Sequence, residues 1–105
     1  MIEVKVTREL EIIKLVEVSG HSGYDELGKD IVCSAVSTAM YMTVGLLEKF
    51  NSKIEFSSND KKPLMKLKIL NNDESTNKIL LNLVDTLEGI VFDYSDYLKI
   101  KEIRR

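Results

Sequence analysis

The chain alternates apolar and polar residues from its start, over residues 2–7 (IEVKVT). A period of two is typical of a β-strand that has one face toward solvent. Residues 11–18 (EIIKLVEV) contain more aliphatic side chains, and we expect a second strand that is buried more nearly on both faces. Residues 8–10 would join these strands in a hairpin, although no Asn-Gly or Asp-Gly pair fixes the type of turn.

An uncharged run at residues 31–47 predicts the first helix. Asp30 stands directly before this run, where an aspartate is a favoured N-cap, and the helix should continue to about Phe50 and end at residues 51–52. The run has 17 residues, several of them Ser or Thr. Because a membrane span needs about 20 predominantly apolar residues, we expect a helix buried inside the domain and no membrane contact.

The rest of the chain predicts three further strands and a second helix. Strands are expected at residues 54–56 and 64–70, with a polar turn at 57–63, and a short strand at 97–103 closes the chain. A helix after residues 71–73 would have an apolar stripe made of Ile79, Leu80, Leu83, Val84, Leu87 and Val91. The order β-β-α-β-β-α-β predicts an α+β fold, a two-layer α/β arrangement with two helices on a mixed sheet. We expect one domain over residues 1–105.

Composition narrows the classes of function. The chain has 105 residues, 44% hydrophobic and 30% charged, as in a globular protein with one core. Fifteen Lys and Arg against 17 Asp and Glu leave no positive excess, so we expect no direct nucleic-acid binding. A single cysteine excludes an internal disulfide and a zinc cluster of several cysteines. With no signal peptide at the start, the expected setting is reducing and cytoplasmic.

The only histidine lies near the start of a glycine-rich segment, residues 19–29, and the only cysteine follows that segment. His21 follows the second predicted strand, and Cys33 falls in the first turn of the predicted helix. A lone cysteine is more often a small buried hydrophobe than a nucleophile. At a helix start, however, free amides and the helix dipole favour the thiolate, and a nearby imidazolium would complete its activation. The placement therefore favours a Cys–His pair.

The sequence leaves two alternatives for the role of Asp30 and two for the role of Ser37. A carboxylate disfavours a nearby thiolate unless its charge is used in capping, so Asp30 should cap the helix, orient His21, or do both. Ser37 lies one turn after Cys33 on the same helix face. Its hydroxyl either bonds back to the carbonyl of Cys33 or lines a substrate site.

These residues resemble the signature of the bacterial ribosomal-processing cysteine protease (Prp) family. That family has a Gly-His pair, a short loop, and Gly-x-Asp-Ile-Val-Cys followed by a small residue and Ala-Val-Ser. The chain departs from it at Ser22, where Ala is common, and at Ser34, where Ala or another small residue is common. The matching residues here are Gly20-His21, Gly28, Asp30-Ile31-Val32-Cys33 and Ala35-Val36-Ser37.

The resemblance implies a cysteine endopeptidase that removes a short N-terminal extension from a large-subunit ribosomal protein, the twenty-seventh. It also implies a homodimer that needs no metal or other cofactor. Cys33 would be the nucleophile and His21 the general base and acid, and the loop at residues 22–29 would be a mobile substrate cover. The supporting or substrate-binding positions would be Gly20, Ser22, Gly23, Gly28, Asp30, Ser34 and Ser37.

The expected mechanism begins with attack of the Cys33 thiolate on the scissile carbonyl. His21 would protonate the departing amine and then activate the water that hydrolyses the thioester. The amides of Cys33 and Ser34 are expected to stabilise the oxyanion. An extended peptide could also pair with an edge strand, which the sequence does not identify.

Three other functions are alternatives to proteolysis. A non-enzymatic ribosome-assembly partner would dock through the loop, with Cys33 incidental. It could use a C-terminal basic patch consisting of Lys99, Lys101, Arg104 and Arg105. A thiol-based redox protein is disfavoured because the chain has no resolving cysteine, and a metal hydrolase because it has one histidine. Cleavage of a precursor peptide distinguishes the protease from the assembly partner.

Overall fold

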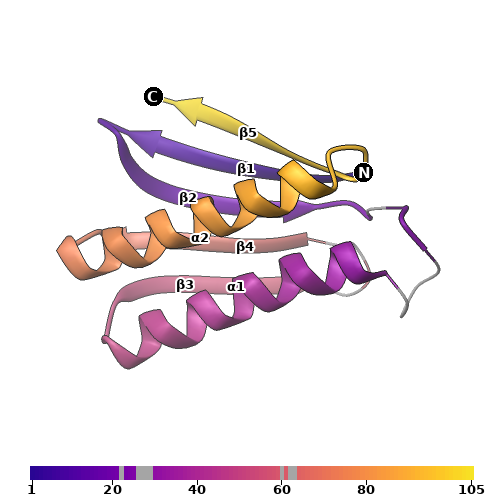
Figure 1. Ribbon diagram of the computed structural model, residues 1–105. Coiled ribbons are helices and arrows are strands. Elements are labelled where there is room, and N and C mark those ends of the chain that lie inside the picture. The colour runs from indigo at the N-terminus through magenta and orange to yellow at the C-terminus, as the bar shows by residue number, and fades with distance from the viewer. Residues whose placement is uncertain (22, 26–29, 60, 62–63) are drawn as a thin grey trace.

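The computed structural model describes residues 1–21, 23–25, 30–59, 61 and 64–105. Five strands and two helices follow in the predicted order (Figure 1). They are β1 (Ile2–Glu9), β2 (Ile12–Ser19), α1 (Ile31–Lys49), β3 (Lys53–Asn59), β4 (Leu64–Asn71), α2 (Glu74–Asp93) and β5 (Leu98–Arg104). The predicted α+β class, with two helices on a mixed sheet, is confirmed.

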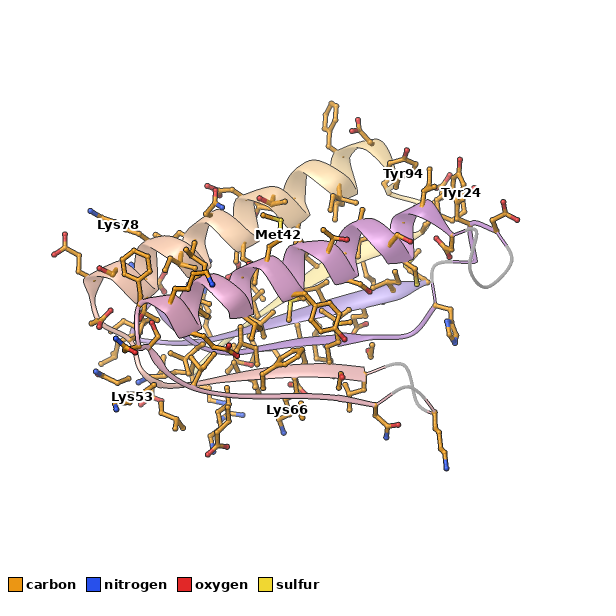
Figure 2. All side chains as sticks on the ribbon, turned by 90° about the horizontal axis from the view of Figure 1, so that it is seen from below. Tyr24, Met42, Lys53, Lys66, Lys78 and Tyr94 are labelled. Carbon is orange, nitrogen blue, oxygen red and sulfur yellow. The ribbon has the colours of Figure 1, made fainter. Side chains whose placement is uncertain are left out.

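The five strands form one sheet in the order β3-β4-β2-β1-β5. β1 and β5 are parallel, whereas the other neighbouring strands are antiparallel. Both helices cover the same face of the sheet, and Figure 2 shows Lys66 on the opposite face. Because α1 leads from β2 to β3 and α2 leads from β4 to β5, the two helices carry the chain to opposite edges of the sheet.

The hydrophobic core lies between the helices and the covered face of the sheet. On β4, Leu67 and Ile69 are buried and Lys66 and Lys68 are exposed, as the period of two predicts. Burying one such aliphatic side chain is worth about 1.5–3 kcal/mol. The other buried apolar residues are Ile2, Val4, Val6, Ile13, Val16, Val18, Val32, Val36, Met40, Val44, Leu47, Leu80, Leu83, Val84, Leu87 and Leu98.

Both helices begin at an aspartate cap. The carboxylate of Asp73 accepts a hydrogen bond from the amide of Thr76 at 2.8 Å at the start of α2. Hydrogen bonds from the Thr76 backbone and side chain lower the pKa of Asp73 below its usual value. Asp30 has the same place before α1, as the sequence predicts.

The expected burial of β2 and α1 is partly wrong. β2 buries Ile13, Val16 and Val18, but Leu15 and Glu17 on the other face are only half-buried because no described element covers that face. α1 buries one face and exposes the other. By length and apolar composition α1 could cross a membrane, but its buried side chains pack into the core beneath it.

Two connections also differ from the expected ones. The β1–β2 turn consists of Leu10 and Glu11, with left-handed φ values of 51° and 66°, and Glu9 pairs with Ile12. β3 extends through residues 57–59, which were expected in a polar turn but pair with β4. Pairing with a neighbouring strand satisfies the backbone groups of this polar segment, and local sequence does not reveal it.

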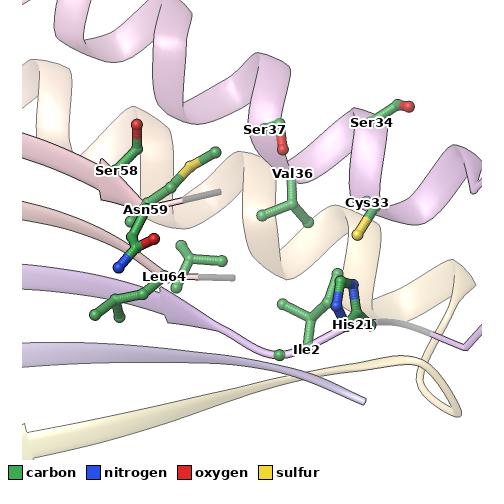
Figure 3. Close-up of a pocket in the computed structure, with 12 residues that line it drawn as sticks. Ile2, His21, Cys33, Ser34, Val36, Ser37, Ser58, Asn59 and Leu64 are labelled. Carbon is green, nitrogen blue, oxygen red and sulfur yellow. The ribbon is translucent and has the colours of Figure 1, made fainter. Parts of the chain in front are cut away.

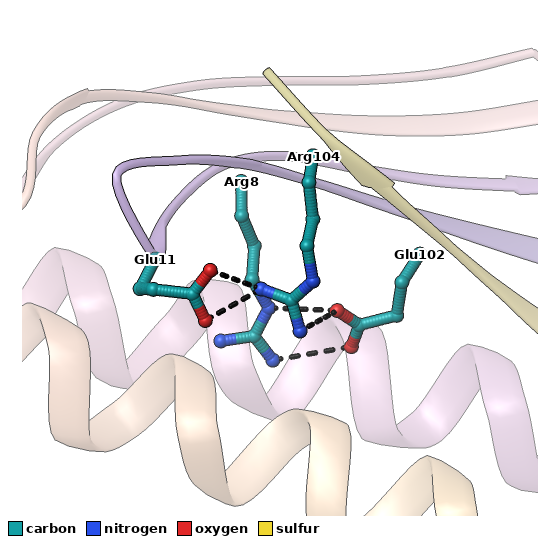
Figure 4. A network of polar contacts seen from close by, with 4 residues as sticks. All are labelled: Arg8, Glu11, Glu102 and Arg104. Carbon is teal, nitrogen blue, oxygen red and sulfur yellow. Dashed lines mark hydrogen bonds and ion pairs between the residues drawn. The ribbon is translucent and has the colours of Figure 1, made fainter.

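A cluster of charged side chains joins the ends of β1 and β5 to the β1–β2 turn (Figure 4). Arg8 donates two hydrogen bonds to the carboxylate of Glu102, at 2.9 and 3.2 Å. Arg104 pairs with Glu102 at 3.2 Å and also with Glu11. Arg104 is therefore neutralised within the fold.

Candidate active site

Cys33 is half-buried in the first turn of α1. The carboxylate oxygen Oδ1 of Asp30 accepts hydrogen bonds from the amides of Val32, at 3.0 Å, and Cys33, at 2.9 Å. Asp30 is itself buried, and these donors offset the cost of burying its carboxylate. The capping role expected of Asp30 is confirmed.

His21 reaches the same region from the end of β2. Gly20 turns the chain with a φ of +90°, and a Cβ atom added there would lie 2.5 Å from the carbonyl oxygen of Met1. Only glycine fits this close approach without moving backbone. Figure 3 shows the Cys33 sulfur pointing toward the side of the cleft on which His21 lies.

A cleft of about 450 Å³ lies between the start of α1, the end of β2 and the β3–β4 hairpin (Figure 3). Its apolar lining consists of Ile2, Val18, Val36, Leu64 and Met65. The other lining residues are Gly20, His21, Cys33, Ser34, Ser37, Ser58 and Asn59. A concave apolar surface with a few convergent polar groups is typical of a binding site.

The imidazole and the thiol share the cleft without contacting each other through a hydrogen bond. In the part of the chain that the structure describes, no hydrogen bond joins His21 to Cys33 or to Asp30. His21 is exposed, so its side chain has room to move. Catalytic hydrogen bonds often tighten only when substrate binds.

The expected oxyanion donors are wrong for this conformation. The amide of Cys33 donates to the Asp30 carboxylate at 2.9 Å, and the amide of Ser34 donates to the Asp30 carbonyl at 3.1 Å. The cap and the first helical hydrogen bond satisfy both groups, so neither amide is available to a developing oxyanion.

Only some of the other predicted site residues line the cleft. Gly20, Ser34 and Ser37 line the cleft, whereas Gly23 is exposed and is not among its lining residues. Between described residues, no hydrogen bond joins the Ser37 hydroxyl to the Cys33 carbonyl. Ser22 and Gly28 lie outside the described residues, as do positions 26, 27 and 29 of the expected substrate cover.

Sequence reasoning missed the wall of the cleft that the β3–β4 hairpin supplies. Ser58 and Asn59 were expected in a turn, and Met65 was expected only as part of a strand. These residues lie beside Cys33 because β4 pairs with β2, which brings the hairpin next to the start of α1. No local motif marks them, since strand order is set by the whole sheet.

Comparison with known proteins shows the family to which the chain belongs. A sequence profile of the cysteine protease Prp family matches residues 1–99. The chain belongs to this family. A curated relative, the ribosomal processing cysteine protease Prp of Mycoplasma genitalium, is 28% identical over 102 residues, which are 97% of this chain and 96% of the relative. The family is one of cysteine proteases.

Solved structures share the whole fold. The essential ribosomal processing protease Prp from S. aureus, in complex with a covalently linked product peptide, has a TM-score of 0.91 at 21% identity, over 97% of this chain and 99% of that one. A protein from Streptococcus mutans has a TM-score of 0.89 at 25% identity, over 100% and 96% of the two chains. Another structure of the S. aureus protease contains a substrate peptide and has a TM-score of 0.87 at 20% identity, over 97% and 99%.

Proposed function

We propose that this protein is a cytoplasmic endopeptidase that uses Cys33 and His21 to remove a short N-terminal extension from a large-subunit ribosomal protein, the twenty-seventh. The observation behind the proposal is that the only cysteine and the only histidine of the chain line one cleft. The family match over residues 1–99 and the ribosomal processing named for the Mycoplasma genitalium relative support it. The peptide complexes of the S. aureus protease support a peptide substrate.

In the proposed reaction, the Cys33 thiolate bonds to the scissile carbonyl carbon. The carbon–nitrogen bond then breaks, and the protonated imidazole of His21 gives its proton to the departing amine. A water molecule, deprotonated by His21, adds to the thioester, and the carbon–sulfur bond breaks to release the carboxylate and the thiol. Proton transfer by a positioned group is worth about 10²–10⁴-fold in rate.

Substrate binding would complete this arrangement. His21 has no hydrogen bond to Cys33 in the described conformation, so the imidazole must approach the thiol when the peptide is present. The apolar lining of the cleft, which includes Val36 and Met65, suits apolar side chains of the peptide. β3 and β5 are the edges of the sheet, and the end of β3 lines the cleft. An extended peptide would therefore pair with β3.

A cleavage assay tests the proposal. The protein is incubated with a synthetic peptide that spans the extension and the first residues of the mature ribosomal protein, and mass spectrometry identifies the products. We expect one cut at the extension boundary with the wild type, and none with Cys33→Ala or His21→Ala. Thr38→Ala is the matched control, because Thr38 is exposed on α1 and does not line the cleft. Cleavage by a folded Cys33→Ala protein would refute the proposal.

The charge arrangement disfavours the alternative of an assembly partner that binds through its C-terminal basic patch. Lys99 pairs with Glu3 at 3.1 Å, and Arg104 pairs with Glu11 and Glu102. Half of the proposed patch is thus used within the fold, and less positive charge remains for a partner.

The proposed enzyme acts as a homodimer, and we propose the outer surface of the helical layer as its interface. A groove of about 330 Å³ runs between α1 and α2 and is lined by apolar parts of Met42, Leu46 and Ile79. Met42 is 72% exposed and Leu46 42% exposed. Apolar side chains gathered in this way are typical of a protein–protein interface.

A further inference from the structure

Three tyrosine rings, those of Tyr24, Tyr94 and Tyr97, meet near His21 in the fold. Figure 2 shows Tyr24 and Tyr94 at the same end of the molecule. Tyr24 lies three residues after His21, and Tyr94 and Tyr97 lie in the connection from α2 to β5. The ring centroids of Tyr24 and Tyr94 are 5.8 Å apart with an interplanar angle of 79°. Those of Tyr24 and Tyr97 are 5.1 Å apart at 72°. Both pairs are edge to face, a favoured arrangement of aromatic rings.

Tyr94 and Tyr97 form a fixed base for the Tyr24 ring. Tyr94 ends α2, and the amide of Tyr97 donates to its carbonyl at 2.9 Å. The carbonyl of Tyr97 in turn accepts from the amide of Ile2 at 2.9 Å, and the Ile2 side chain lines the cleft. Both rings are half-buried and pack against the core. A backbone hydrogen bond therefore connects the base directly to a residue that lines the cleft.

The sheet fixes the chain on the other side of His21. Ser19 pairs with Glu3 of β1 and with Leu64 of β4. Only four residues separate Ser19 from Tyr24, and an extended chain advances at most about 3.3–3.6 Å per residue. Two of the four are glycines, Gly20 and Gly23, each with a positive φ. Anchoring both ends limits the positions that His21 can reach.

His21 needs such an anchor because its own ring is weakly held. The side chain is exposed, and among the described residues it takes part in no hydrogen bond or ion pair. Ordering a glycine-containing segment costs conformational entropy, which a packed ring at one end reduces. We infer that Tyr24 is a positioning residue, which holds the His21 imidazole at the cleft by packing against Tyr94 and Tyr97. The inference rests on the proposed function for the catalytic role of His21.

The kinetic test separates positioning from substrate binding. Tyr24→Ala should lower kcat for cleavage of the precursor peptide about tenfold, the size expected from the loss of two edge-to-face pairs. KM should change less than about twofold, because Tyr24 is not among the described residues that line the cleft. Tyr24→Phe keeps the ring and should retain kcat within about twofold. An unchanged kcat in Tyr24→Ala, or an equal loss in Tyr24→Phe, would overturn the inference.

Tyr41→Ala is a matched control. Tyr41 forms an edge-to-face pair with Phe56 whose centroid distance of 5.8 Å and angle of 79° equal those of Tyr24 and Tyr94. It is 51% exposed on α1, and Tyr24 is 40% exposed. Tyr41→Ala should retain kcat within about twofold, and both alanine variants should melt within a few degrees of each other. A similar loss of kcat in both would indicate a general effect of ring removal and would refute a positioning role.

A second readout does not depend on activity. Because His21 is the only histidine, its imidazole resonance in NMR spectra needs no further assignment. In Tyr24→Ala this resonance should sharpen and move to its position in an unstructured peptide, whereas Tyr24→Phe and Tyr41→Ala should leave it unchanged. An unmoved resonance in Tyr24→Ala would overturn the inference. If the wild type cleaves no peptide but the resonance moves as expected, the proposed function fails and the positioning role stands.

Discussion

At Gly20, the neighbouring backbone leaves no room for a side chain. Gly20 connects the sheet to His21 with a φ of +90°, and a Cβ added there would collide with the carbonyl of Met1. Gly23, on the other side of His21, has a φ of +74°, and no atom of the described residues lies within 4 Å of an added Cβ. The two glycines thus both have a positive φ and differ in the space around them.

Gly20 and Gly23 allow a prediction about the free energy of unfolding. Gly23→Ala adds only the strain of a left-handed residue and should lower the free energy of unfolding by about 1 kcal/mol. Gly20→Ala adds the same strain and a collision with a backbone atom, which should bring the loss to about 2–4 kcal/mol. Urea denaturation monitored by circular dichroism measures both. Equal losses in the two variants would contradict the collision with Met1.

Asp30 combines a structural and an electrostatic effect, and two variants separate them. Asp30→Asn keeps an acceptor for the amides of Val32 and Cys33, so the free energy of unfolding should change little. Asp30→Ala removes the acceptor and should cost about 0.5–2 kcal/mol, measured in urea. Because the cap uses the charge of the carboxylate, Asp30→Asn should change the rate at which Cys33 reacts with iodoacetamide at pH 7 by less than about twofold. A reaction about tenfold faster would show that the carboxylate disfavours the thiolate despite its capping role.

At the scale of elements, the β1–β2 turn is held by pairing and not by its own residues. Leu10 and Glu11 both have left-handed φ values in a two-residue hairpin that usually contains Asn-Gly. Leu10 is 86% exposed, so burial does not compensate its strain. The alternating strands on either side pair in the register that buries Val4, Val6 and Val16, and the turn adopts the conformation that this register requires.

Leu10→Asn should therefore stabilise the protein. Asparagine adopts the left-handed conformation more readily than leucine, and we expect a gain of about 0.5–1 kcal/mol in the free energy of unfolding. Urea denaturation is again the measurement. Leu70→Asn serves as the control, since Leu70 is exposed on β4 and asparagine is disfavoured in strands. A gain in the control as large as in Leu10→Asn would indicate a general effect of removing exposed leucines.

At the scale of the whole molecule, the helical layer has two functions. Its inner face closes the core, and its outer face presents the groove between α1 and α2 that contains Met42. If the protein is a homodimer through this groove, Met42→Lys should place a charge in the interface and yield a monomer. Light scattering coupled to size exclusion measures the mass. Phe92→Lys is the control, because Phe92 is exposed on α2 but does not line the groove, and it should leave the dimer intact. A monomeric wild type would refute the dimer.

The sequence by itself determined the order of the elements and the local patterns that form them. The Asp30 cap, the apolar stripe of α2 and the alternation in β4 are local patterns, because capping and periodicity depend on residues only a few positions apart. For the same reason the Asp30 cap placed Cys33 in the first turn of a helix, and the aliphatic run at residues 11–18 placed His21 just beyond a strand. These predictions needed no knowledge of the sheet.

The tertiary structure decided what surrounds the thiol. The β3–β4 hairpin forms a wall of the cleft because β4 pairs with β2, and the Tyr24 ring meets Tyr94 and Tyr97 because α2 ends beside the start of β1. Which amides remain available near Cys33 depended on the bonds that Asp30 makes. Each of these contacts joins groups whose distance is set by the packing of the whole chain, so no window of neighbouring residues contains the information.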